Sequence, residues 1–386
     1  MKKIYDLVIK TRRDLHKIPE KSLKEYKTSK YIENFLKKRN IKYEYVSQTG
    51  IVSFIKGKNN FKIALRADID ALEITEKTSL KFASEHKGVM HACGHDFHMA
   101  NLLALVDYYS ENTPETDLIL IFQPGEEGAG GAKLILKNGL WNVFGKPDVI
   151  FGYHVKPDLE TGVVAAAKGK AWAGTLSFEI TLKGAGGHGA NPDKTSDLMM
   201  IFSQWYLHVQ AFISRKINTF KNVVVTVGEI RGASRLNIIT SKLTLKGMLR
   251  YFENEEKNFL LTQMEKSIMF FSELYGAKAE FKVLEDAIPL INNSELLTKI
   301  NDFYKKTYIK KTNEYLPDLK ECFPVMLAED FPEYLRDVKG VFFFLGAMKN
   351  TPMELHTPIL DLNEEALFYG VNFMITLIKN YDKWLW

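Results

Sequence analysis

Asp117-Leu-Ile-Leu-Ile-Phe122 is a single aspartate followed by five apolar residues, and this stretch decides the fold class of the chain. A short run that is apolar at every position is typical of a strand buried on both faces of a parallel sheet, because a half-exposed strand alternates with polar residues. Further strand patterns occur at Phe61-Lys-Ile-Ala-Leu-Arg66, Asp148-Val-Ile-Phe-Gly-Tyr153 and Val341-Phe-Phe-Phe-Leu345.

Helical patterns lie around and between these strands. Apolar residues recur at helical spacing over the ranges 4–15, 26–39, 95–110 and 363–380. Strands that alternate with helices predict an α/β fold built on a mainly parallel sheet.

A different pattern begins near residue 175. Leu176, Phe178, Ile180 and Leu182 alternate with polar residues, which is typical of a half-exposed strand. The elements expected after it are a helix, two strands, a helix and a strand, at 196–214, 222–230, 242–252, 255–274 and 278–285. This β-α-β-β-α-β order is the ferredoxin-like arrangement.

The change of pattern predicts two domains. Residues 175–287 form an inserted ferredoxin-like domain, and residues 1–174 and 288–386 form the parallel-sheet domain that surrounds the insertion in sequence. A chain of 386 residues has the length for two domains of ordinary size.

The composition excludes several classes of protein. The net charge of +5 is modest and no block of five or more basic residues occurs, so we expect no nucleic-acid partner. No run of 18 apolar residues occurs, so we expect no membrane span. Two cysteines, Cys93 and Cys322, cannot build a disulfide framework, and they favour a cytoplasmic location.

Chemically active side chains collect after the predicted strands, most of them within a few residues of the strand end. They are Asp68, Asp70, Glu126, Glu127, His154 and, after the last strand, His356. In open α/β sheets, ligands bind outside the carboxyl ends of the strands. We therefore expect these groups to converge on one crevice.

The stretch Met90-His-Ala-Cys-Gly-His-Asp-Phe-His98 adds further metal-ligand types. It holds three histidines, a cysteine and an aspartate within nine residues. Thiolate, imidazole and carboxylate groups are ligands that zinc and similar metals accept. Cys93 and His95 stand just ahead of a predicted helix, where they can join the crevice.

The charges of the crevice favour a metal centre. Several carboxylates packed around an empty crevice would repel one another, and one or two divalent cations would supply the counter-charge. Glu126 and Glu127 can divide the work, one as a ligand and one as a general base on water. Taken singly, a Glu-Glu pair is more often surface charge and a buried cysteine is more often a packing residue.

Five stretches in chain order make the sequence recognisable. They are Arg66-Ala-Asp-Ile-Asp-Ala-Leu72, Met90 to His98 as quoted above, Phe122-Gln-Pro-Gly-Glu-Glu-Gly128, Gly186-Gly-His-Gly-Ala-Asn-Pro192 and Leu355-His-Thr-Pro358. Together they resemble the signature set of the M20 metallopeptidase family, in its aminoacylase and amidohydrolase branch. Asp14-Leu-His-Lys-Ile-Pro-Glu20 fits as well. Within the branch, Phe82-Ala-Ser-Glu-His86 is most similar to N-acetyldiaminopimelate deacetylases.

The resemblance implies a dinuclear metal site in the larger domain. Two divalent ions per subunit are expected, with zinc, manganese, cobalt and nickel left open. The implied ligands are Cys93, which bridges the ions, and His95, Glu127, His154 and His356. The implied supporting residues are His91, Asp96 and His98.

The resemblance also implies roles for five further residues. Glu126 matches the general base, and Asp70 matches the aspartate that orients a ligand. The inserted domain becomes a lid that mediates a homodimer, with His188 reaching the partner's active site to stabilise an oxyanion. Asn237 and Arg250 match lid positions that hold the α-carboxylate of the substrate.

Three residues depart from the family pattern. Glu73 and Thr240 stand where proline is common, and Gly125 stands where alanine is common. None of them removes an expected ligand or the base.

The implied reaction is metal-dependent hydrolysis of the amide bond of an N-acyl amino acid, a small-molecule substrate. The first expectation is deacetylation of N-acetyl-L,L-diaminopimelate to L,L-diaminopimelate and acetate in lysine biosynthesis. A broad-specificity N-acyl-amino-acid amidohydrolase of the hippurate hydrolase type is the alternative, and a dipeptidase is the third. A non-catalytic binding protein on the same scaffold is a remote alternative, since every expected ligand and the base are present.

Overall fold

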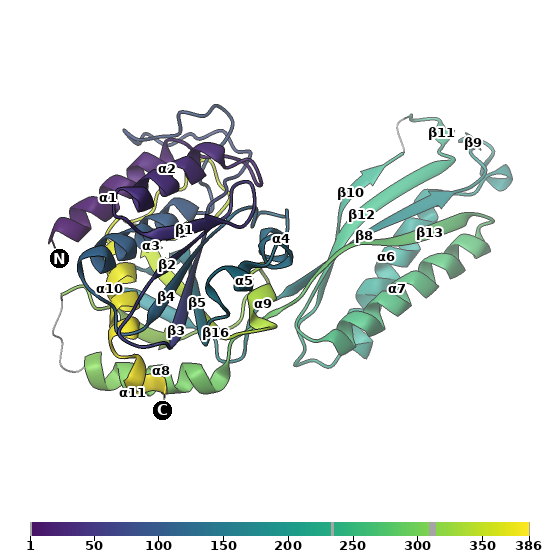
Figure 1. Cartoon of the computed structure of the whole chain (residues 1–386). Helices are drawn as coiled ribbons and strands as arrows, with labels where there is room; N and C mark the ends of the chain where they lie inside the picture. Colours follow the sequence, from purple (N-terminus) through teal and green to yellow (C-terminus); the bar gives the residue numbers. More distant parts are fainter. Residues whose placement is uncertain (1, 233–234, 309–313, 386) are drawn as a thin grey trace. The chain divides into compact units, whose positions relative to one another are not determined.

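The computed structural model describes residues 2–232, 235–308 and 314–385. The chain forms two compact units (Figure 1). The first unit takes in 1–171, 291–323 and 330–386, and the second takes in 172–290 and 324–329. The sequence does not predict that the short segment 324–329 belongs to the second unit, where Ala173 N donates to the carbonyl oxygens of Val325 and Leu327.

An eight-stranded sheet forms the centre of the first unit, in the order β1-β2-β4-β3-β5-β16-β6-β15. The four central strands β4, β3, β5 and β16 are parallel, which agrees with the expected mainly parallel α/β sheet. The strands are β1 (Lys42–Tyr45), β2 (Ile51–Ile55), β3 (Lys62–Asp68), β4 (Asp117–Gln123), β5 (Val149–Glu160), β6 (Val163–Ala166), β15 (Asp318–Glu321) and β16 (Lys339–Met348).

Helices pack on both faces of this sheet. Adjacent residues of β16 show the two faces, because Phe343 contacts Phe373 of α10 whereas Phe342 contacts Phe331 beside α9. The helices of this unit are α1 (Lys2–His16), α2 (Tyr26–Lys37), α3 (His95–Glu111), α4 (Gly131–Lys137), α5 (Leu140–Phe144), α8 (Ser294–Tyr308), α9 (Pro332–Leu335), α10 (Ala366–Lys379) and α11 (Tyr381–Leu385). The central strands are buried on both sides, as their apolar sequences predict.

One strand is longer than the sequence predicts. The expected strand 148–153 continues as β5 to Glu160, because Val155 and Lys156 remain paired with Leu345 and Gly346 of β16. His154 therefore lies within β5, not after it.

The second unit has the β-α-β-β-α-β order that the sequence predicts. Its antiparallel sheet has the order β10-β12-β8-β13, with buried side chains of α6 and α7 in the core between helices and sheet. The elements are β8 (Gly174–Lys183), α6 (Leu198–Lys216), β10 (Val224–Arg231), β12 (Lys242–Tyr251), α7 (Asn254–Leu274) and β13 (Lys278–Ala287). A small ribbon of β9 (Gly187–His188) and β11 (Ile238–Ile239) and the 3-10 turn η1 (Pro192–Lys194) complete this unit.

A second two-stranded ribbon, β7 (Lys170–Trp172) with β14 (Leu290–Ile291), lies where the chain passes between the units. Within the described ranges, no helix combines the length and the apolar character needed to cross a bilayer.

Candidate metal centre

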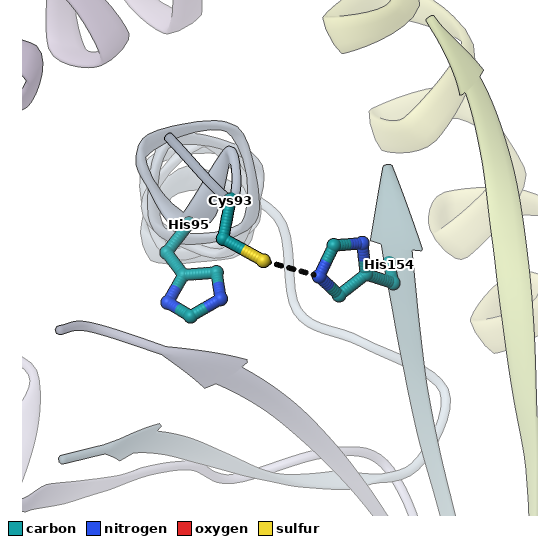
Figure 2. Close-up of side chains that lie close together, drawn as sticks. All are labelled: Cys93, His95 and His154. Atoms are coloured by element: carbon teal, nitrogen blue, oxygen red, sulfur yellow. Dashed lines mark hydrogen bonds between the residues drawn. The ribbon is translucent and has the colours of Figure 1, made fainter. Parts of the chain in front are cut away.

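A cysteine and three histidines from distant parts of the chain meet at one end of the parallel strands. The Cys93 sulfur lies 3.2 Å from His154 Nε2 and 3.2 Å from His356 Nε2. His95 completes a buried group with Cys93 and His154 (Figure 2). These four residues are ligands that the family resemblance implies.

The backbone places these side chains through two unusual conformations. Gly94 has φ +81°, and a Cβ atom there would lie 2.4 Å from Val155 Cγ2, so glycine alone suits the turn between Cys93 and α3. His356 has φ +61°, a left-handed conformation that is uncommon for a residue with a side chain. Its N–H donates to Ala92 O at 2.8 Å, which ties the late loop to the cysteine loop.

Backbone carbonyls set the tautomers of two histidines. His95 Nδ1 lies 2.9 Å from Asp70 O, and His154 Nδ1 lies 2.7 Å from Val155 O. A carbonyl oxygen can only accept, so each Nδ1 carries a hydrogen, and in the neutral ring Nε2 then presents its lone pair as a ligand. This arrangement is the usual outer support of a metal-bound histidine.

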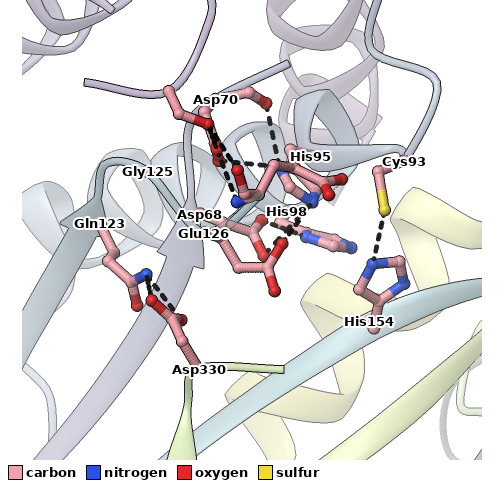
Figure 3. A network of polar contacts seen from close by, with 12 residues as sticks. Asp68, Asp70, Cys93, His95, His98, Gln123, Gly125, Glu126, His154 and Asp330 are labelled. Carbon is pink, nitrogen blue, oxygen red and sulfur yellow. Dashed lines mark hydrogen bonds and ion pairs between the residues drawn. The ribbon is translucent and has the colours of Figure 1, made fainter. Parts of the chain in front are cut away.

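Glu126 and Glu127 lie on the turn that follows β4. Glu127 Oε1 is 3.4 Å from His356 Nε2, and Glu126 Oε2 is 3.9 Å from His95 Nε2. Asp70 holds both sides of the site, because its Oδ2 accepts from Glu127 N at 2.9 Å and its Oδ1 lies 3.3 Å from His95 Nδ1 (Figure 3).

Three polar atoms at this centre are buried without a hydrogen bond. They are His95 Nε2, Glu127 Oε1 and Asp70 Oδ1. A buried polar atom without a partner is costly, and an unfilled ligand position is one explanation for it. The nitrogen, oxygen and sulfur donors collected here suit divalent ions such as zinc, cobalt, nickel or manganese.

The charges of the site also call for a cation. Burial lowers the pKa of His95, but Asp68, Asp70 and Glu127 outweigh burial and raise it to about 10. Burial and the neighbouring Glu127 raise the pKa of the Cys93 thiol well above its usual range. A divalent ion reverses both tendencies, since it favours the thiolate and competes with the imidazole proton.

Asp68 differs from the expectation that its negative charge needs a metal ion. It forms a buried ion pair with Arg66 at 2.7 Å, and His98 Nδ1 lies 2.5 Å from its other oxygen. Val155 N donates to His98 Nε2 at 3.0 Å, so His98 Nδ1 carries the hydrogen that Asp68 accepts. The protein itself therefore neutralises Asp68. The carboxylates that call for a metal are Asp70, Glu126 and Glu127.

His91 and Asp96 are buried near α1, where Asp96 contacts Arg12 and His16 and the ring of His91 lies 6.2 Å from that of His16. Asp96 Oδ2 accepts from Arg12 Nε at 2.8 Å and lies 2.8 Å from His16 Nδ1. Burial lowers the pKa of His91 to about 3, so its ring is neutral. Neither residue joins a group of three or more metal-ligating side chains among the described residues.

Three further residues contact the surroundings of the site, namely Ser22, Glu25 and Asp330. The sequence does not predict them. Asp330 accepts from Arg66 Nη2 at 2.9 Å and from Gln123 Nε2 at 2.8 Å (Figure 3). No local motif predicts these contacts, because they depend on residues from far along the chain. For Glu25, the sequence offers one indication of a structural role, because the residue stands directly before a predicted helix.

The second unit holds the remaining predicted site residues. His188 of β9 pairs with Ile238 of β11, and Gly189 N donates to Asn237 O at 2.8 Å. The ribbon thus places His188 and Asn237 next to each other on an exposed part of the unit. Their predicted approach to a metal centre stays a prediction.

Arg250 lies at the other end of β12 from this ribbon. Eight residue steps at roughly 3.3 Å separate it from the first residue of the strand, a distance of about 26 Å. Its Nη1 donates to Met326 O at 2.6 Å. Asn237 and Arg250 can therefore bind one carboxylate only if they come from different subunits.

The three departures from the family pattern are accommodated locally. Glu73 is exposed and pairs with Lys21, and Thr240 Oγ1 donates to a carbonyl two residues along its own turn. Gly125 has φ +61°, and a Cβ atom there would lie 2.7 Å from Leu23 Cδ2. The left-handed backbone conformation is the main reason why a side chain is disfavoured at this position.

Comparison with known families and curated proteins gives a consistent result. The profile described as peptidase family M20/M25/M40 matches residues 64–380. An N-acetyldiaminopimelate deacetylase of Streptococcus gordonii is 34% identical over 369 residues, covering 94% of this chain and 95% of the relative. A protein of the same name from Listeria innocua is 33% identical over 375 residues, covering 96% and 98%.

Solved structures agree with the sequence comparison. A Bacillus subtilis protein described as a dinuclear metal binding peptidase from the M20 family is 30% identical, with a TM-score of 0.83. The match covers 98% of each chain, so it takes in both units.

Proposed function

The chain belongs to the peptidase family M20/M25/M40, and from this premise we propose that it removes the acetyl group of N-acetyl-L,L-diaminopimelate. The family and the deacetylase-named relatives support a metal-dependent amidohydrolase as the reaction class. The observation that carries the proposed reaction class is the convergence of Glu126 with the five proposed metal ligands within one unit.

Two of the groups of neighbouring ligand side chains share Cys93, and a further group joins His95, Glu126 and Glu127. Cys93, His95 and His154 form one group, and Cys93, Glu127 and His356 form the other. If two divalent ions were bound, Cys93 would help to hold them, because it belongs to both groups. The Bacillus subtilis relative is described as a dinuclear metal binding peptidase, which supports two ions at this site.

Divalent ions bound here would supply Lewis acidity that eases deprotonation of a water and polarises an acyl carbonyl. Glu126 would accept the proton of the attacking water, because its carboxylate lies beside the cluster, with Oε2 3.9 Å from His95 Nε2. The same carboxylate would then deliver the proton to the departing amine. Asp70 would hold His95 and the Glu127 backbone in fixed positions relative to each other during turnover.

The lid residues would complete the site from a second copy of the chain. His188 would stabilise the negative charge that develops on the acyl oxygen. Asn237 and Arg250 would hold the α-carboxylate, and their separation within one subunit favours a homodimer with shared sites. The cytoplasmic location expected from the two cysteines stays a prediction.

The choice of substrate rests on the names of the relatives. Two curated relatives that match nearly the whole chain carry the name N-acetyldiaminopimelate deacetylase, which would place this chain in lysine biosynthesis. A broad-specificity N-acyl-amino-acid amidohydrolase is the alternative within the same chemistry. Comparison of kcat/KM for N-acetyldiaminopimelate, hippurate and N-acetylmethionine separates the two.

The general base is tested by Glu126→Gln in the metal-loaded enzyme. We expect kcat to fall about 100- to 10,000-fold, since the amide cannot take up a proton. Metal content measured by elemental analysis should stay unchanged, because Glu126 is not among the proposed ligands. Turnover close to that of the unmodified enzyme would overturn the assignment.

A further inference from the structure

The loop between α1 and α2 runs alongside the site and contacts it at several points. Lys21 forms an isolated parallel bridge with Ala71, and Ala71 N donates to Glu20 O at 2.8 Å. Leu23 has φ +62°, a left-handed conformation that β-carbon-bearing residues rarely adopt. Such a conformation persists only where surrounding contacts hold it.

The Glu25 carboxylate is the centre of these contacts. It is fully buried, and its Oε1 accepts from Gly125 N at 2.9 Å and from Leu23 N at 2.7 Å. Its Oε2 accepts from Thr49 Oγ1 at 2.7 Å. Glu25 thus holds the peptide N–H of the residue directly before Glu126.

Ser22 holds the other side of the same turn. Its hydroxyl lies 2.7 Å from Asp70 Oδ2 and 3.1 Å from Glu127 O. Asp70 Oδ2 also accepts from Glu127 N. The backbone on both sides of Glu126 is therefore held by side chains from outside the turn.

The turn needs this support because its own sequence is permissive. Gly125, Gly128 and Gly130 all have positive φ, and glycine has the greatest backbone freedom of any residue. A general base acts efficiently only when its carboxylate is held in hydrogen-bond reach of the proton it abstracts. The turn has internal bonds from Gly128 N to Glu126 O and from Gly131 N to Gly125 O, and the outside anchors add to the restraint that these place on Glu126.

We propose that Glu25 is a positioning residue for Glu126, which fixes the turn through Gly125 N without touching substrate or metal. The proposal rests on the proposed function, in which Glu126 is the general base. Ser22 assists from the other side through Asp70 and the Glu127 carbonyl. The N-terminal loop is thus part of the catalytic apparatus although it supplies no ligand and no reacting group.

Substitutions at Glu25 test the geometry separately from the charge. Glu25→Gln keeps an oxygen that accepts from Gly125 N, and the Thr49 hydroxyl can rotate to accept from the new amide. Glu25→Asp keeps the charge but withdraws the carboxylate by one methylene. We expect kcat within about threefold of the unmodified enzyme for Glu25→Gln, and a loss of about 10- to 100-fold for Glu25→Asp and Glu25→Ala. KM and metal content should change little.

Glu20→Ala is the matched control. Glu20 Oε2 accepts from Lys27 N, Thr28 N and Thr28 Oγ1 at the start of α2. Among the described residues, these side-chain hydrogen bonds of Glu20 do not reach the turn that carries Glu126. Loss of these bonds loosens the same helix without releasing Gly125. A drop in kcat for Glu20→Ala equal to that for Glu25→Asp would overturn the proposal, as would unchanged kcat in Glu25→Asp.

A measurement independent of activity separates this proposal from the proposed function. Amide hydrogen exchange in a peptide that contains Gly125 to Gly128 should be faster in Glu25→Asp than in the unmodified protein, and unchanged in Glu25→Gln and Glu20→Ala. If the unmodified enzyme hydrolyses no N-acyl amino acid, the proposed function fails while exchange still reports on the anchor. If the exchange rate of this peptide in Glu25→Asp equals that in the unmodified protein, Glu25 does not anchor the turn, whatever the activity of the variant.

Discussion

At the scale of single residues, the metal centre depends on side chains that would be ill-placed without an ion. His95, Cys93 and Glu127 are buried or half-buried, and their ligand atoms face one another across the cluster. The carboxylates favour a proton on His95, and burial disfavours a thiolate on Cys93. A divalent cation is the species that satisfies all three at once.

Cys93→Ala should remove metal from the protein. Because Cys93 belongs to both ligand groups, we expect loss of at least one metal equivalent per subunit and loss of nearly all activity. Elemental analysis of the purified variant measures the metal directly. Cys322→Ala is the matched control, since Cys322 is the other cysteine and joins none of the recorded ligand groups. Full metal content in Cys93→Ala would contradict the bridging role.

The sequence predicts which side chains converge, but it does not predict what surrounds them. Cys93 and His95 share one motif and Glu126 and Glu127 share another, and the structure brings the four together. Their roles as ligands and base stay predictions. Asp68 was grouped with the free carboxylates, yet it pairs with Arg66 and His98. Spacing along a strand does not reveal which neighbour across the sheet neutralises a charge.

At the scale of elements, loops tied by buried polar groups position the site. The segment after β3 is fastened to α1 through Glu76, which accepts from Thr78 Oγ1 and from Ser84 N at 2.7 Å and lies 3.4 Å from His16 Nε2. Burial alone would raise the pKa of Glu76, but its bonds with His16, Thr78 and Ser84 outweigh burial and lower it to about 2.

Glu76 should make the stability of the metal-free protein depend on pH in the acid range. A depressed folded pKa gives stability that is present above the unfolded value of 4.5 and is lost as the pH falls toward about 2. Glu76→Gln should therefore lower the Tm by about 2 °C at pH 7, and the difference from the unmodified protein should shrink between pH 4.5 and 2.

Glu85→Gln provides the comparison for this pH series. Glu85 forms an exposed ion pair with Lys17 at 3.8 Å, and such pairs contribute little to stability. The Tm of Glu85→Gln should equal that of the unmodified protein at every pH. If the Tm difference between Glu76→Gln and the unmodified protein grows as the pH falls, the expected direction of the pH dependence is wrong.

Strand and helix positions followed closely from apolar periodicity, and the exceptions have a common cause. The strand 148–153 extends to Glu160 because β16 continues to pair with it, and short strands such as β6 and β15 escaped prediction. A sheet partner can extend a strand past the end of its apolar run. Periodicity along one segment carries no information about such partners.

At the scale of the whole molecule, the second unit would supply His188 to the site of a second copy. The ribbon that carries His188 and the end of β12 that carries Arg250 lie at opposite ends of this unit. Residues so far apart in one subunit act on one small substrate only when two subunits contribute. The proposed chemistry therefore needs a second copy of the chain, and the homodimer stays a prediction.

Mixing two inactive variants tests this requirement. His188→Ala and Glu126→Gln should each be inactive alone and should each retain metal. After subunit exchange, mixed dimers would contain one intact site, so we expect about one quarter of the activity of the unmodified enzyme. Activity that stays at the level of the separate variants, although light scattering shows mixed dimers, would place His188 in the site of its own subunit.

The sequence by itself determined the fold class, the order of elements in the second unit, the family and the chemical types of the site residues. These follow from local patterns, because apolar periodicity and short motifs are written in contiguous residues. Only the tertiary structure decided that Cys93 lies between His154 and His356, and that Arg66 neutralises Asp68. Only it revealed the anchoring of the Glu126 turn by Glu25. Those contacts join residues far apart in the chain, and their hydrogen bonds and charges exist only once the sheet has brought the segments together.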